Sequence, residues 1–150
     1  PRGDGDWGDC DPAEPRNRRT RCSMLARQSG PDGATHVLID TSPDLREQLI
    51  DADVSWVDGV FITHEHADHC HGIDDLRALF VHKRRRVDVY TSEHTAKTLR
   101  ARFGYCFESP PGSEYPPIAR EHRVTPGEPV TIGWPLDGWD LAIASDGDQG

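Results

Sequence analysis

The sequence has no long apolar run and no excess of basic residues. No stretch approaches the roughly 20 consecutive apolar residues of a membrane-spanning helix, and the polar N-terminus, Pro1–Asp6, has no apolar signal-peptide core. The formal net charge of −9 excludes a general nucleic-acid coat, because such proteins displace counterions with a basic surface. It also argues against binding to an anionic membrane surface. We therefore expect neither a membrane-bound protein nor a nucleic-acid coat.

Cysteine is also scarce. The four cysteines, Cys10, Cys22, Cys70 and Cys106, are scattered and form no C-x-x-C pair. This spacing argues against a disulfide framework and favours reduced thiols, which are typical of the cytoplasm. The chain is more polar than an average globular domain, with a mean hydropathy of −0.70. Its 150 residues fit one domain that is large enough to bury a core.

Apolar patterning predicts strands that alternate with helices. One helix is expected after Thr41–Asp44, with an apolar stripe of Leu45, Leu49 and Ile50. A second follows a histidine-rich segment, and a third begins after Thr91-Ser92 and ends at Gly104. Strands are expected at residues 22–27, 35–40, 60–63, 87–90, 130–132 and 141–144. This order predicts a layered α/β architecture, in which ligands lie beyond the carboxyl ends of the strands.

The histidine-rich segment directly follows an apolar strand. It reads Thr63-His64-Glu65-His66-Ala67-Asp68-His69-Cys70-His71 and holds four of the eight histidines. In an extended chain, residues two apart point the same way, so His64 and His66 can hold one ion, and Asp68 and His69 can reach a second. Imidazole and carboxylate ligands suit zinc, manganese or iron. Two such ions about 3.5–4 Å apart can share a hydroxide and clamp a phosphate or carbonyl oxygen.

The pattern His64-x-His66-x-Asp68-His69 resembles the H-x-H-x-D-H signature of the metallo-β-lactamase superfamily. Four further segments are similar to the branch that contains the phosphoribosyl cyclic phosphodiesterase of phosphonate breakdown; they are residues 17–23, 38–46, 72–77 and 102–107. The resemblance implies an αβ/βα sandwich and hydrolysis of a small or cyclic phosphodiester. It also implies that His64 and His66 hold one metal and that Asp68 and His69 hold the other. Asp68 would in addition orient the attacking water.

The family also supplies later ligands, which bear on how complete this site is. The chain is expected to be the N-terminal half to two-thirds of the fold, as a single domain truncated at both ends. Either Asp146 or the segment Asp148-Gln149-Gly150 is a candidate for a later family segment, with Gln149 then replacing a histidine. Zinc or manganese is the expected cofactor, as two ions, with iron as an alternative. A homodimer is left open.

Three other residues have two interpretations each. Asp40 matches a strand-end acid of the superfamily and is interpreted either as a hydrogen-bond acceptor for a ligand imidazole or as a turn acid. His71 either touches substrate or is an ordinary histidine in a first helical turn. For Arg77 we favour a local ion pair with Asp74, three residues earlier, over a contact with phosphate.

Two other functions compete with a metal-dependent phosphodiesterase. One is a metal-binding half-domain without turnover. The other is a relative of the pyrroloquinoline quinone biosynthesis protein with this fold.

Overall fold

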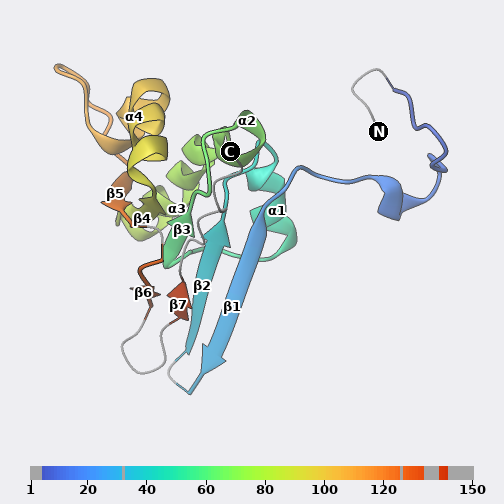
Figure 1. The fold of residues 1–150 in the computed structure, drawn as a ribbon, viewed down its shortest axis with the longest axis horizontal. Helices are drawn as coiled ribbons and strands as arrows, with labels where there is room; N and C mark the ends of the chain where they lie inside the picture. The colour runs from blue at the N-terminus through green and yellow to red at the C-terminus, as the bar shows by residue number, and fades with distance from the viewer. Residues whose placement is uncertain (1–4, 32, 126, 134–138, 142–150) are drawn as a thin grey trace.

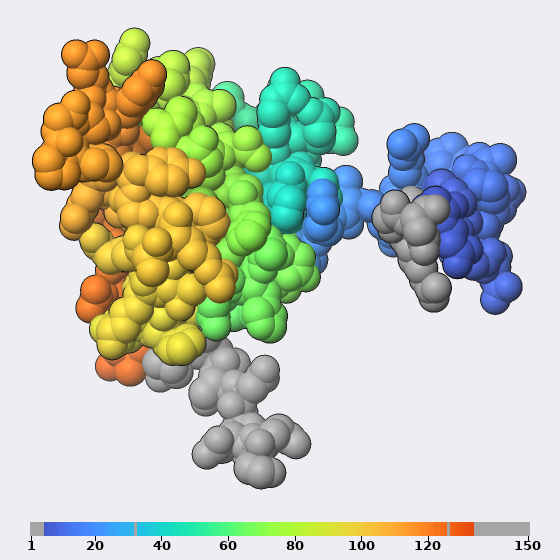
Figure 2. Space-filling view, turned by 90° about the horizontal axis from the view of Figure 1, so that it is seen from above, coloured from blue at the N-terminus to red at the C-terminus, as the bar shows by residue number. Residues whose placement is uncertain are grey.

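The computed structural model describes residues 5–31, 33–125, 127–133 and 139–141. The N-terminal segment, which includes a short 3-10 helix at Pro15–Asn17, projects away from the rest of the described chain (Figure 1, Figure 2). Within the described residues, none of the helices has the length and apolarity needed to cross a bilayer.

The centre of the fold is a five-stranded mixed sheet in the order β1-β2-β3-β4-β5. Strands β1 (Met24–Gly30) and β2 (Gly33–Ile39), which overlap the strands predicted at 22–27 and 35–40, form an antiparallel hairpin. Strands β3 (Gly59–Phe61), β4 (Val87–Thr91) and β5 (Ala119–Arg123) continue the sheet in parallel with β2. A separate antiparallel pair consists of β6 (Val130–Ile132) and β7 (Trp139–Leu141). The predicted strand at 141–144 lies mostly outside the described residues.

Alternating side chains give the sheet two apolar faces. Leu38, Val60 and Val89 belong to the main core, which is shared with residues of helices α1 (Leu45–Asp51), α3 (Leu76–Lys83) and α4 (Glu93–Phe107). Their neighbours Val37 and Phe61 point to the opposite face, as expected for the two-residue period of a strand. There they form a smaller cluster with Ile132 of β6. The predicted α/β architecture is confirmed, with helices on one face and a second β layer beginning on the other.

Two details of the predicted helices are wrong. Helix α1 buries Leu45 and Leu49, but Ile50 is 56% exposed and is not part of its apolar stripe. Helix α4 starts as predicted, because the Ser92 side chain accepts a hydrogen bond from the Thr95 backbone N–H. It does not end at Gly104, however, but bends at Phe103 and runs on to Phe107. Phe107 is buried in the main core, so tertiary packing extends the helix beyond the glycine.

The buried cysteines should be chemically inert in the folded protein. Burial raises the pKa of both the Cys70 and the Cys106 thiol, the latter to about 11. Only the thiolate is nucleophilic, and at pH 7 about one Cys106 thiol in 10⁴ is ionised, a fraction that grows as the pH rises toward 11. We expect iodoacetamide at pH 7 to modify the exposed cysteines, Cys10 and Cys22, and to spare the buried pair until the chain is denatured. Peptide mass spectrometry would check this, and rapid native labelling of Cys106 would contradict it.

Candidate metal centre

The histidine cluster lies at the carboxyl end of the parallel strands. Strand β3 ends at Phe61, and the chain then runs extended to His66, whose φ of −65° and ψ of 150° precede the short helix α2 (Ala67–Cys70). Helix α2 lies just beyond the tips of β2 and β3 (Figure 1). The backbone N–H of Thr41, which follows β2, donates to the carbonyl of His69 at 2.7 Å. The exit of β2 thus holds the cluster against the edge of the sheet.

His64 and His66 present ring nitrogens to a common point. His64 Nε2 lies 3.1 Å from His66 Nδ1. The other nitrogen of His64, Nδ1, lies 3.0 Å from the Thr63 hydroxyl oxygen. When Nδ1 carries the proton and donates it to Thr63, the lone pair of Nε2 is directed at a shared ligand.

His69 and Asp68 form a second pair of donor groups on α2. His69 Nε2 lies 3.5 Å from Asp68 Oδ2, and the Asp68 side chain is 55% exposed. The rings of His64 and His69 are also neighbours, with centroids 4.0 Å apart. The four residues predicted as ligands are therefore brought together, as two adjacent donor pairs.

Asp40 contacts His69 directly and His64 through Thr63. Its Oδ2 lies 2.7 Å from His69 Nδ1, which leaves Nε2 of His69 for a metal. It also accepts hydrogen bonds from the Thr63 hydroxyl at 2.9 Å and from the Thr63 backbone N–H at 2.8 Å, and Thr63 in turn contacts His64. Of the two interpretations of Asp40, the structure therefore supports the hydrogen-bond acceptor for an imidazole. Carboxylates in this position fix the tautomer and orientation of metal-binding histidines.

The backbone of Asp40 has an unusual conformation. Its φ is 63°, in the left-handed region that non-glycine residues seldom occupy and that Asp and Asn tolerate best. The side chain is only 8% exposed, so its carboxyl group depends on the partners that it has found. Such conformations persist where the surrounding structure over-determines them, and they concentrate at functional sites.

The donor geometry fits bound metal ions. Metal–nitrogen distances of about 2.1 Å at a tetrahedral ion separate two donor atoms by about 3.4 Å, and an octahedral ion separates them by about 3.0 Å. The separation of 3.1 Å for His64–His66 falls between these values, and that of 3.5 Å for His69–Asp68 is close to the tetrahedral one. The residues thus suit divalent cations that accept imidazole and carboxylate ligands.

The remaining predicted residues do not belong to the two donor pairs in the part of the chain that the structure describes. His71 lines a surface hollow of about 500 Å³ beside His66, together with Arg102 and Phe103, and its ring meets that of Phe103 edge-on at 5.5 Å. Arg77 pairs with Asp74 at 2.8 Å, the favoured of its two interpretations. The candidates Asp146, Asp148 and Gln149 fall outside the described residues.

Two residues that contact the histidine-rich segment were not predicted from the sequence. Cys22 Sγ lies 3.5 Å from His69 Nε2, and Arg102 Nη1 donates to the Glu65 carbonyl at 2.7 Å. Both come from segments far from the cluster in sequence, and no local spacing signals them. Their segments were noted only for their family resemblance.

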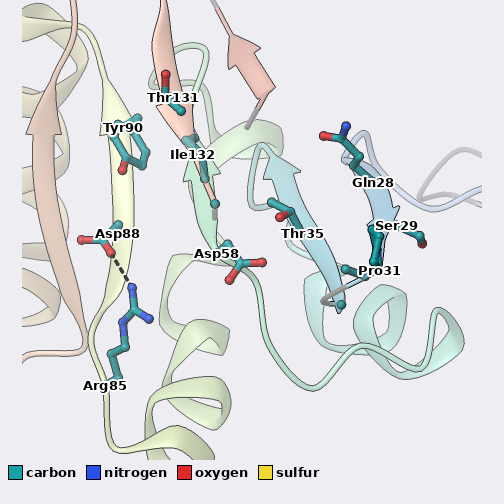
Figure 3. Close-up of a pocket in the computed structure, with 14 residues that line it drawn as sticks. Gln28, Ser29, Pro31, Thr35, Asp58, Arg85, Asp88, Tyr90, Thr131 and Ile132 are labelled. Carbon is teal, nitrogen blue, oxygen red and sulfur yellow. Dashed lines mark ion pairs between the residues drawn. The ribbon is translucent and has the colours of Figure 1, made fainter. Parts of the chain in front are cut away.

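A second hollow of about 530 Å³ lies at the other end of β2 from Asp40. Figure 3 shows Arg85 and Asp88, an ion pair at 3.5 Å, on one side of it, and Thr35 and Ser29 on the other. Among the described residues that line it there is neither histidine nor cysteine. The hollow beside His66 is lined by one predicted ligand, His66, and by His71, so it is the better candidate for a substrate site next to the histidine cluster.

Comparisons with known proteins show the family and the fold of the chain. The family model of the beta-lactamase superfamily domain matches residues 35–142. A crystal structure described as a new diphosphatase from the PhnP family is 31% identical and superposes with a TM-score of 0.66, over 88% of this chain and 48% of that one. YhfI of Bacillus subtilis, a metallo-β-lactamase fold protein, is 19% identical with a TM-score of 0.52, over 76% of this chain and 42% of that one, which shows the fold alone.

One curated relative is named as a transferase and not as a hydrolase. An octanoyltransferase of Porphyromonas gingivalis is 35% identical over 125 residues, which are 82% of this chain and 24% of that protein. The chain thus spans about a quarter of this relative and about half of the diphosphatase. The aligned quarter leaves most of the relative unmatched, so its name does not describe the shared segment specifically.

Proposed function

The chain belongs to the beta-lactamase superfamily, and we propose that it carries metal ligands of a hydrolase that cleaves a phosphodiester or diphosphate bond in a small molecule. The observation that carries the proposal is the pairing of His64 with His66 and of Asp68 with His69 at ligand-like separations. The likeness to a PhnP-family diphosphatase supports phosphorus as the reacting centre. The superfamily resemblance and the metallo-β-lactamase fold predicted from the sequence are confirmed.

Each residue of the centre would have a distinct task. Bound divalent cations, zinc or manganese, would lower the pKa of a water molecule and stabilise negative charge on phosphate oxygens. His64 and His66 would hold one ion, and His69 and Asp68 the other, with a carboxylate oxygen of Asp68 also positioned to accept a proton from the attacking water. Asp40 would keep His69, and through Thr63 also His64, in the tautomer whose Nε2 is free to bind a metal.

The hollow beside His66 suits a phosphate-bearing substrate. Arg102 brings a guanidinium to its wall, and guanidinium groups favour phosphate oxygens through charge-assisted hydrogen bonds. Phe103 and His71 add ring faces and edges for the organic part of a small substrate. These features favour a phosphate ester or anhydride over an uncharged lactam.

Metal content and turnover test the proposal together. The protein that contains this chain would be stripped with a chelator, loaded with zinc or manganese and desalted, and its metal content would then be measured by mass spectrometry. Hydrolysis of bis(p-nitrophenyl) phosphate and of a nucleoside diphosphate compound would be followed in parallel. We expect about two ions per chain and metal-dependent release of product. Metal binding without any turnover would favour the catalytically incomplete alternative, and no metal binding would refute the proposal.

Asp40→Asn tests the orienting role of Asp40. Asparagine tolerates the same positive φ and can still accept a hydrogen bond, but it cannot supply a carboxylate oxygen to both Thr63 and His69. We expect metal affinity or turnover to fall by about 10- to 100-fold while the fold is kept. Isothermal titration with zinc and circular dichroism would measure the two effects.

Asp53→Asn provides the matched control. Asp53 also has a positive φ, of 51°, but it is exposed, and its backbone N–H donates to the Ile50 carbonyl of α1. This variant should bind metal as the unmodified protein does. Equal losses in both variants would show that the effect of Asp40→Asn is not specific to its contacts with the metal centre.

A further inference from the structure

We propose that Arg102 of α4 is a positioning residue for the metal ion held by His64 and His66, because its guanidinium fixes the peptide group between these two histidines. The inference rests on the proposed metal-dependent function and adds to it a residue outside the histidine-rich segment. The proposed function already gives Arg102 a contact with substrate phosphate. A guanidinium has five N–H donors, so one of them can bind the backbone while others bind phosphate.

Arg102 acts on the carbonyl group of Glu65. Arg102 Nη1 donates to this carbonyl at 2.7 Å, a separation typical of a charge-assisted hydrogen bond. The peptide unit is planar, so fixing the Glu65 carbonyl also fixes the orientation of the amide that joins it to His66. This orientation sets the direction in which the chain reaches the His66 Cα. The separation of 3.1 Å between His64 Nε2 and His66 Nδ1 depends on that direction.

The same carbonyl is tied to helix α2. Cys70 Sγ donates to it at 3.3 Å, and Cys70 is fully buried. A carbonyl oxygen has two lone pairs, so it can accept from Arg102 and Cys70 together. Cys70 directly follows His69 in α2. The Glu65 carbonyl therefore lies where α4, α2 and the chain between His64 and His66 meet.

The side chain of Glu65 contacts α4 as well. Its Oε2 accepts a hydrogen bond from the Thr95 hydroxyl at 3.3 Å, and its Oε1 lies 3.4 Å from His94 Nε2. Thr95 and Arg102 are seven residues apart, which is about two turns of an α-helix and places both on one face. Helical side chains tilt toward the N-terminus, so Arg102 reaches back along α4 toward the turn that contains Thr95. Two turns of the helix thus hold the one residue between the histidines.

The competing account is that Arg102 only attaches α4 to the loop and does not affect the metal position. Arg100, two residues earlier on α4, provides the comparison. Its guanidinium pairs with Glu108 at 2.7 Å and with Glu121 of β5 at 2.6 Å, and none of its contacts with described residues reaches the histidine-rich segment. Arg100→Met and Arg102→Met are therefore the same chemical change on one helix, with different expected results.

Imidazole NMR signals of the full chain distinguish these accounts. The ring signals of His64, His66 and His69 would be followed in ¹⁵N-histidine protein, first without metal and then during a zinc titration buffered by a competing chelator. In metal-free Arg102→Met, the His64 and His66 signals should shift. The circular dichroism should stay unchanged, because Arg102 is exposed.

The zinc titration should separate the two metal positions. In Arg102→Met the midpoint read from His64 and His66 should move to roughly tenfold higher free zinc or more, since residues that support metal ligands cost about that much when lost. The midpoint read from His69 should change far less. Arg100→Met should lower the melting temperature, because it removes two ion pairs, and should leave the ring signals and both midpoints unchanged.

The possible outcomes separate this inference from the proposed function. An unchanged midpoint for His64 and His66 in Arg102→Met, or an equal shift in Arg100→Met, would overturn the positioning role alone. Ring signals that do not respond to zinc in the unmodified chain would overturn both proposals.

A measurement on the unmodified chain does not depend on how the variants fold. Coupling between binding events is reciprocal, so a hydrogen bond that tightens zinc binding is itself stabilised by zinc to the same extent. Saturating zinc should therefore slow the exchange of the Arg102 guanidinium protons with water and leave the exchange of the Arg100 protons unchanged, as measured by NMR. Equal exchange of the Arg102 protons with and without zinc would refute the inference.

Discussion

Replacing Asp68 with alanine is expected to abolish the proposed hydrolytic activity of the protein that contains this chain. The substitution removes the carboxylate that lies 3.5 Å from His69 Nε2. Of the two ligands that α2 is proposed to supply to the second metal ion, only His69 would remain. Loss of one group that stabilises developing charge costs about 10²–10³ in turnover, and loss of a metal ligand should cost at least as much. Steady-state rates and metal content per chain, measured on the same sample, would show the loss.

The fold should survive this change, because the Asp68 side chain is more than half exposed. Asp51→Ala is the matched control, since Asp51 is an exposed acid at the end of α1 with no role in the centre. It should retain the unmodified rate. An Asp68→Ala protein that still turns over substrate at that rate would show that the centre is assigned to the wrong residues.

Replacing Gly72 with alanine is expected to destabilise the fold and the metal centre together. A Cβ at this position would lie 2.0 Å from the Ser42 carbonyl oxygen and 3.0 Å from Leu45 Cβ. The backbone has little freedom to relieve the clash, because the Gly72 N–H donates to the Thr41 carbonyl at 2.9 Å. We expect the free energy of unfolding to fall by about 3 kcal/mol and the melting temperature by roughly 6–12 °C.

Gly104→Ala controls for the loss of a glycine as such. A Cβ at Gly104 meets nothing within 4 Å, and the residue lies inside α4. Alanine should therefore leave the stability unchanged or raise it by up to about 1 kcal/mol. Thermal unfolding followed by circular dichroism would compare the two variants. Similar melting temperatures for both would contradict the close approach of the Gly72 and Ser42 backbones.

The parts of the molecule that follow from local patterns were predicted from the sequence. Apolar runs placed β2, β3 and β4, and the Ser92 cap placed the start of α4. Strand β5 was missed, because its sequence, Ala119–Arg123, has a single buried apolar residue. It is held instead by pairing with β4 and by ion pairs such as that between Arg100 and Glu121, at 2.6 Å. Contacts of this kind are set by distant segments and leave no local period.

The same division applies to the metal centre. The four predicted ligands lie within six consecutive residues, and the strand and helix that flank them determine how close they come. Asp40 was identified as a candidate but its partner was left open, because its contact with His69 spans 29 residues. Cys22 was not predicted at all, since its approach to His69 depends on how the N-terminal segment packs against α1.

Anomalous diffraction from a crystal loaded with zinc would test the central claim most directly. Data collected on both sides of the zinc absorption edge locate bound zinc independently of any assumed site. We expect one peak within about 2.1 Å of His64 Nε2 and His66 Nδ1, and a second within about 2.2 Å of His69 Nε2 and an Asp68 oxygen. Zinc-specific peaks located only elsewhere on the protein, with none between these side chains, would contradict it.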